Sequence, residues 1–123
     1  MTWTARTLAS ALALAALGAG ATPEVRPATG RYVAELCVAT SAASPSCGPA
    51  QVDLRANGMA TVRVDDIVYH LKLNSSQVEV VVMHNIVQID EFTVPYTWAG
   101  STLQFDDDDR HSRYEIRFPE RKH

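Results

Sequence analysis

The sequence has no excess of basic residues, only two cysteines, and no long hydrophobic segment after its first residues. Its 123 residues include 11 Lys and Arg against 14 Asp and Glu, a formal net charge of −3. A nucleic-acid binder needs a basic surface, so this composition argues against one. With 46% hydrophobic and 20% charged residues, the chain is also unlike a disordered one. It fits a single globular domain.

Residues 1–21 are predicted to be a signal peptide. Arg6 supplies a positive start, the segment from Leu8 to Leu17 is almost entirely apolar, and Ala19-Gly20-Ala21 has the small-x-small pattern of a cleavage site. A bilayer-spanning helix needs roughly 20 apolar residues, and this run is shorter. We therefore expect cleavage after Ala21, no transmembrane segment in the mature form, and a bacterial protein that is periplasmic or secreted.

No later segment has helical periodicity, and apolar residues alternate as they do in half-buried strands. Residues 22–29 contain two prolines and form an irregular lead-in, residues 30–119 form the β domain, and residues 120–123 are a C-terminal tail. The alternation predicts about eight short strands, near residues 32–38, 52–54, 60–64, 67–73, 78–83, 86–98, 102–105 and 114–118. The fold class is therefore all-β, a single small antiparallel up-and-down β-barrel or a compact sandwich.

Local residue types predict the turns. Asn57-Gly58 tolerates the positive φ of a type I′ turn and joins the second strand to the third. The inward positions change from even to odd numbers at Asp65-Asp66, which marks a turn or a bulge. His84-Asn85 is interpreted as a two-residue turn; if the strand instead continues through His84, that side chain is buried and titratable. The strand at 78–83 is apolar on both faces, so we expect it to be central.

Cys37 and Cys47 are the only cysteines in the chain. An even count in an exported protein favours a disulfide between them. The spacing is not that of a C-x-x-C redox motif, and a free thiol or a metal-binding pair is the alternative.

The run Asp106-Asp107-Asp108-Asp109 is the most acidic segment of the chain. Carboxylate oxygens are ligands for Ca²⁺, but the run lacks the glycine of an EF-hand loop and has Arg110 where the third ligand belongs. We interpret it as a solvated hairpin turn balanced by Arg110 and Arg113. Calcium binding no tighter than about 10⁻⁴ M is the alternative. The histidines lack the spacing of a zinc site, and no cofactor is predicted.

The opening Gly30-Arg31-Tyr32 resembles the G-x-W start of lipocalin-like barrels, with Tyr in place of Trp, and residues 92–103 are similar to the late strands of small periplasmic barrels in that group. The resemblance implies a small apolar ligand or a protein partner, bound through Tyr32, Tyr96 and Trp98 or through the loops. His84 is a further candidate contact. Periplasmic lysozyme inhibitors are similar small exported barrels, but their S-G-x-x-Y motif is missing here. In general aspect the chain looks like exported antigen-type proteins of Gram-negative bacteria.

The pattern of polar residues favours a function without catalysis. Ser75 and Ser76 lack a G-x-S-x-G context, and Asp90-Glu91 is equally typical of an exposed strand break, so no nucleophile with a base is identified. We predict an exported, non-enzymatic binding or interaction protein of the bacterial envelope, a monomer with an unidentified partner. The alternative is a lipocalin-like carrier with an apolar cavity of roughly 300 Å³ or more; an enzyme or a lysozyme-inhibitor-like protein is the remaining one.

Overall fold

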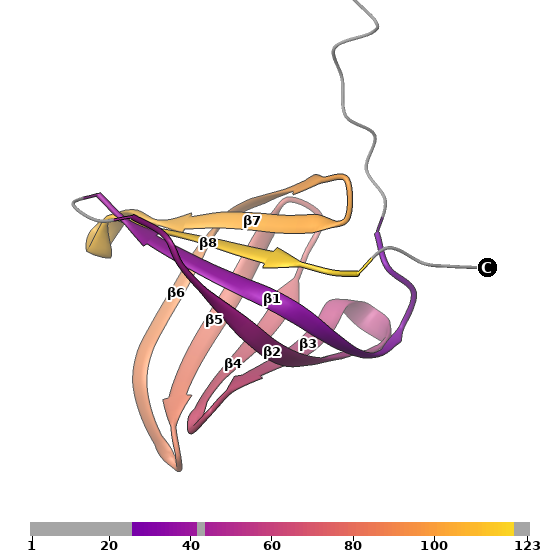
Figure 1. The fold of residues 1–123 in the computed structure, drawn as a ribbon, viewed down its shortest axis with the longest axis horizontal. Coiled ribbons are helices and arrows are strands. Elements are labelled where there is room, and N and C mark those ends of the chain that lie inside the picture. Colours follow the sequence, from indigo (N-terminus) through magenta and orange to yellow (C-terminus); the bar gives the residue numbers. More distant parts are fainter. Residues whose placement is uncertain (1–25, 42–43, 120–123) are drawn as a thin grey trace, which may run out of the picture.

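The computed structural model describes residues 26–41 and 44–119. They form a closed antiparallel barrel in which each strand pairs with the next and the last pairs with the first (Figure 1). The strands are β1 (Gly30–Thr40), β2 (Ser46–Leu54), β3 (Met59–Val64), β4 (Ile67–Leu73), β5 (Gln77–His84), β6 (Val87–Ala99), β7 (Thr102–Asp107) and β8 (Ser112–Arg117). The prediction of an all-β up-and-down fold is confirmed, and the closed ring identifies it as a barrel.

Helical structure in the described part of the chain is confined to two short 3-10 turns, η2 (Ala56–Gly58) and η3 (Asp108–Arg110). No helix there is long and apolar enough to cross a membrane. The predicted signal peptide (1–21), residues 22–25 of the predicted lead-in and the predicted tail (120–123) lie outside the described residues.

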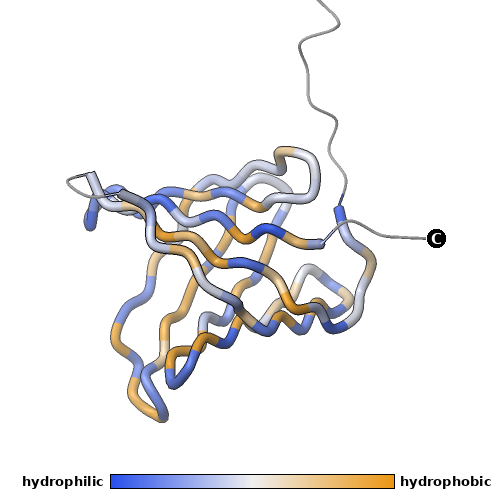
Figure 2. The backbone as a smooth tube through the Cα atoms, in the orientation of Figure 1, coloured by the Kyte–Doolittle hydropathy of each residue, from blue (hydrophilic) through white to orange (hydrophobic). Residues whose placement is uncertain are grey.

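Every second side chain of the strands points into the barrel, which is why hydrophobic and hydrophilic residues alternate along the chain (Figure 2). Val62, Val78 and Val80 are completely buried. Aromatic rings fill the space beside them: Phe105 stacks on Tyr114 with 5.1 Å between ring centroids, and Phe92 stacks on both at 6.3 and 6.1 Å. The interior is therefore occupied by side chains of the barrel itself.

The turn between β2 and β3 contains the predicted Asn57-Gly58 pair, and both residues have positive φ, 65° and 75°. The loop is one residue longer than a type I′ turn, because Ala56 belongs to it and Arg55 N–H donates to Met59 O. A Cβ at Gly58 would lie 2.3 Å from Leu73 O, so no other residue fits there. The predicted change of face at Asp65-Asp66 is confirmed as the turn between β3 and β4.

Two predictions about β5 are corrected. The turn after it is Asn85-Ile86 rather than His84-Asn85, because His84 still pairs with Val87 and Asn85 is the residue with positive φ, 56°. His84 ends the strand and is exposed, so it is not a buried titratable group. The strand is also not central, since a closed ring has no central strand. Val81 is an apolar residue on the outer face of β5, and it is only half-buried.

At one end of the barrel, strands part from their neighbours. β2 pairs with β3 only through Gln51–Leu54, and β6 pairs with β7 only through Tyr96–Ala99. Both partings lie toward the end that carries the β1–β2, β3–β4, β5–β6 and β7–β8 turns, which we call the hairpin end. Pro49 and Pro95 stand where the two ladders stop, as expected for a residue that has no N–H to donate.

Cys37 and Cys47 form the predicted disulfide. They are direct partners in the β1–β2 ladder, with Cα atoms 4.0 Å apart. The bond closes the hairpin whose turn includes residues 42–43, which lie outside the described part.

We predict that Cys37→Ser lowers the free energy of unfolding by about 2–3 kcal/mol while the barrel still forms. The physical reason is the entropy that the closed ring of residues removes from the unfolded chain, roughly 2.7 kcal/mol for a ring of this size. Urea denaturation measures the change, and alkylation of the exported protein should find no free thiol. Two reactive thiols in folded, non-reduced protein would contradict the bond.

Candidate functional site

The hairpin end holds a buried carboxylate that sequence reasoning assigned to solvent. Asp106 and Asp107 belong to β7 instead of the turn, and the alternation of the strand points Asp107 into the barrel, where it is 3% exposed. The interpretation of all four Asp residues as a solvated turn is therefore wrong for Asp107. Asp108 and Asp109 do lie in the exposed turn η3.

Arg110 connects this carboxylate to the opposite wall. Its Nε lies 2.9 Å from Asp90 Oδ2 and 4.0 Å from Asp107 Oδ2. Asp90 faces inward because it pairs with the interior residue Val82 across the β5–β6 ladder. The guanidinium therefore crosses the gap where β6 has parted from β7 and joins the two strands by charge.

Two tyrosines lie beneath the Asp90–Arg110–Asp107 cluster. The rings of Tyr69 and Tyr114 meet edge to face at 5.9 Å. Burial, together with the charges of Tyr69 and Asp107, raises the pKa of Tyr114 to about 12. Burial also raises the pKa of Tyr69. Both phenols are thus held in their neutral form at the mouth of the barrel.

The four Asp residues do not converge on a common point. Asp106 faces outward and accepts hydrogen bonds from Arg113 at 2.9 and 3.4 Å, while Asp107 faces inward. Among residues 26–41 and 44–119, the single group of three potential metal ligands is Glu35 with Cys37 and Cys47, whose sulfurs are bonded to each other. The geometry gives no support to the calcium alternative at Asp106–Asp109.

The β5–β6 hairpin exposes large apolar side chains at its tip. Ile86 is 91% exposed, and Val87 and Ile89 are 58% and 50% exposed. Figure 1 shows this hairpin and the β3–β4 hairpin ending together at the bottom of the view. They are joined by a hydrogen bond from Asn85 N–H to Asp66 O and by a 2.9 Å contact between His84 Nε2 and Asp66 Oδ2. Isolated exposed apolar residues are ordinary, but a cluster on a tip is typical of a contact surface.

The parting of β6 from β7 leaves β6 with an unpaired edge. Between Val87 and Val94 the strand pairs with β5 on one side and has no ladder partner on the other within the described chain. Glu91 N–H donates a hydrogen bond to the Asp90 carboxylate, with 2.9 Å between Glu91 N and Asp90 Oδ1. Tyr96 N–H donates to Ser76 O on the β5 side. Tyr96 lies an odd number of residues after both Glu91 and Thr93. Because N–H directions alternate along a strand, the N–H groups of Glu91 and Thr93 face the unpaired edge.

The four predicted ligand contacts are divided between the two ends. Tyr32 and Trp98 meet at the end opposite the hairpin end, where both rings contact Phe118 at 5.3 and 5.9 Å. Tyr96 lies on the same strand face as Trp98 but donates its hydroxyl proton to Asn74 O at 2.6 Å. Within the described chain Trp98 Nε1 is buried and has no hydrogen-bond partner. His84 lies at the hairpin end, so it does not belong to the same site.

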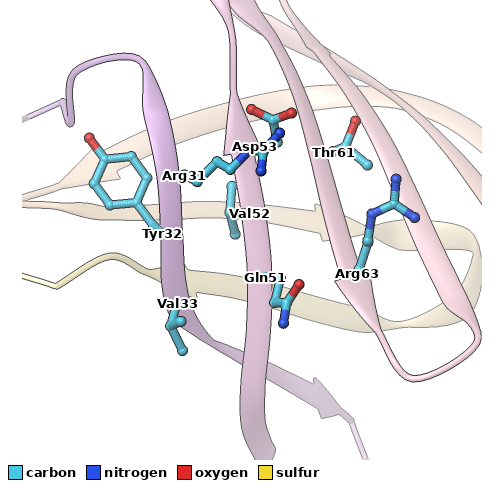
Figure 3. A pocket seen from close by; sticks show the side chains of 8 residues that line it. All are labelled: Arg31, Tyr32, Val33, Gln51, Val52, Asp53, Thr61 and Arg63. Carbon is cyan, nitrogen blue, oxygen red and sulfur yellow. The ribbon is translucent and has the colours of Figure 1, made fainter.

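A hollow of about 380 Å³ lies on the outer face of β1, β2 and β3. Figure 3 shows Arg31 extending from β1 toward Asp53 on β2, with Arg63 beyond it on β3. The exposed side chain of Val33 lies at its edge. The hollow is open to solvent and mixed in charge, which differs from the enclosed apolar cavity that a carrier needs.

Comparison with protein-family models, with curated proteins and with solved structures finds no match for this chain. The resemblance to lipocalin-like barrels therefore stays a prediction that rests on the quoted residues.

We predict that Arg110→Met lowers the free energy of unfolding by about 1–2 kcal/mol, because it leaves the buried Asp107 carboxylate without a counter-charge. Arg110→Met combined with Asp107→Asn should recover part of the loss, since the buried group is then neutral. Urea denaturation of the single and double variants decides this. Equal stability of Arg110→Met and the parent protein would show that the cluster is not coupled.

We predict that stability falls as pH rises from 10 to 12. Tyrosine in the unfolded chain ionises near pH 10, whereas burial raises the pKa of Tyr114 to about 12 in the fold. The stability contributed by the neutral phenol is complete below pH 10 and is lost as pH rises toward 12. Tyr114→Phe should flatten this dependence, as followed by tyrosinate absorbance and denaturation. A tyrosinate signal complete before any loss of structure would contradict the assignment.

Proposed function

We propose that the protein is an exported, non-enzymatic interaction protein that contacts a partner through its hairpin end. The observation that carries the proposal is the contrast between the barrel interior, which stacked rings and valines fill, and the exposed apolar tip formed by Ile86, Val87 and Ile89. A barrel whose interior is occupied by its own side chains has its outer surface and loops left for recognition.

The polar groups support binding in place of catalysis. His84 contacts Asp66, and within the described chain no serine, threonine or cysteine is a hydrogen-bond partner of that pair. In the Asp90–Arg110–Asp107 cluster the guanidinium of Arg110 lies between two carboxylates and bridges them. Such an arrangement fixes loops instead of activating a reactant.

The export part of the proposal rests on the apolar leader and on the disulfide. Cys37 and Cys47 are bonded on the outer side of a hairpin, and disulfides persist in oxidising compartments. The periplasm or the extracellular medium provides that environment.

Site-specific photocrosslinking in the native cells tests the proposal. A photoreactive phenylalanine analogue replacing Ile86 at the exposed tip should give one defined protein adduct. The same analogue replacing Glu79, which is exposed on the outer face of β5, is the matched control and should give none. Equal labelling from both positions would contradict a contact at the tip.

A small molecule recovered from the purified native protein would instead favour the carrier. In the described chain the buried Trp98 Nε1, beside Phe118, has no hydrogen-bond partner, and a polar group of such a ligand would supply one. Mass spectrometry of the native material reports such a ligand.

A further inference from the structure

We propose that the unpaired edge of β6 docks an extended segment of a partner protein whose side chains alternate between basic and apolar, so that the segment adds a strand to the barrel wall. This inference rests on the proposed function and names the partner's chemistry. It follows from the edge, from the side chains beside it and from the charge of that wall.

The edge has the hydrogen-bonding groups that an added strand requires. Thr93 N–H and the C=O groups of Glu91 and Thr93 point away from β5, whereas Glu91 N–H donates to the Asp90 carboxylate, and β7 pairs with β6 only beyond Pro95. An extended peptide binds such an edge through main-chain hydrogen bonds, while alternate side chains give selectivity. A hollow of about 330 Å³, lined by Pro95, Asp106 and Asp108 among others, opens where the two strands separate.

The inward side of the docked segment would meet apolar surface. Phe92 and Val94 point inward from β6 and are partly buried, and the ring of Phe92 stacks on Phe105 of β7. The exposed Val87 and Ile89 extend the apolar surface toward the tip. Every second residue of the partner segment should therefore be apolar.

The outward side of the segment would meet negative charge. Residues 67–107, which form β4 to β7, contain five acidic residues and one basic residue, Lys72. Glu91 is exposed on the edge itself, and Asp106, which is paired with Arg113, and Asp108 lie across the gap. Basic side chains at the outward positions match this charge, whereas acidic ones are repelled.

The same charge disfavours a second copy of this chain as the occupant. Two β6 edges brought together would place acidic side chains of both copies close to one another, and like charges opposed across strands are destabilising. Asp90 additionally occupies Glu91 N–H at 2.9 Å, which blunts the edge against casual pairing. A basic partner replaces the charge repulsion with attraction, and Thr93 N–H remains for a main-chain hydrogen bond.

Amide hydrogen exchange followed by NMR on the mature, oxidised chain tests the proposal. In the protein alone, the Thr93 amide should exchange faster than those of Phe92 and Val94, which bond to β5. A synthetic peptide of about eight residues with alternating Lys and Val, long enough for one strand, should slow exchange at Thr93. The matched peptide with Glu in place of Lys should leave it unchanged.

Two variants locate the contact. Thr93→Pro removes the edge N–H without touching the β5 ladder and should weaken binding of the Lys-Val peptide about tenfold, a change of about 1.4 kcal/mol. Thr93→Val retains the N–H and should bind like the parent protein. If Thr93→Pro does not fold, Glu91→Lys decides, because reversing that charge should also weaken the Lys-Val peptide.

Three results would overturn the proposal: slow Thr93 exchange in dilute protein alone, equal binding of both peptides, or concentration-dependent protection of Thr93 without peptide, which would identify a second copy. If the Lys-Val peptide does not bind at Thr93 but the crosslink from position 86 persists, this inference alone is overturned. Loss of that crosslink would instead contradict the proposed function.

Discussion

The ladder between β1 and β8 is the constraint on which the rest of the structure depends. Residues 35–40 of β1 pair with residues 112–117 of β8, and this pairing turns a meander into a ring. Arg117 donates across the ladder to Glu35 at 3.3 Å, and the disulfide at Cys37 ties the same strand to β2. Because Ser41 N–H bonds His111 O, closure also fixes the loop from which Arg110 reaches the opposite wall.

The closing ladder reaches the hairpin end, where Thr40 pairs with Ser112, whereas two other ladders stop short of it. At the hairpin end β2 leaves β3 and β6 leaves β7, so the barrel widens into two walls of four strands, β7-β8-β1-β2 and β3-β4-β5-β6. Where the walls separate, side chains replace backbone hydrogen bonds: Arg110 bridges to Asp90, and Phe92 stacks on Phe105. The polar cluster and the unpaired edge of β6 both result from the separation of β6 from β7.

Local patterns in the sequence predicted the strands because side-chain alternation is a property of a few consecutive residues. The change of face at Asp65-Asp66 and the positive φ of Asn57 were visible for that reason. The burial of Asp107 was not, since it depends on where β7 ends and on Arg110 reaching a distant strand. The edge of β6 depends on which strands are neighbours; Pro49 and Pro95 were the available signal, because proline within a strand indicates a missing partner.

The acidic residues of the β6 wall have opposite effects on two kinds of encounter. Exposed strand edges invite pairing with other chains, and natural proteins blunt them with charge, proline and bulges. Here Pro95 ends the ladder with β7, a register shift between Val82 and Met83 distorts the ladder with β5, and the carboxylate of Asp90 covers Glu91 N–H. Each device disfavours pairing with another copy of the same acidic wall. The exposed carboxylates of this wall disfavour pairing with another copy of it, and the same carboxylates match the basic segment that we propose as its partner.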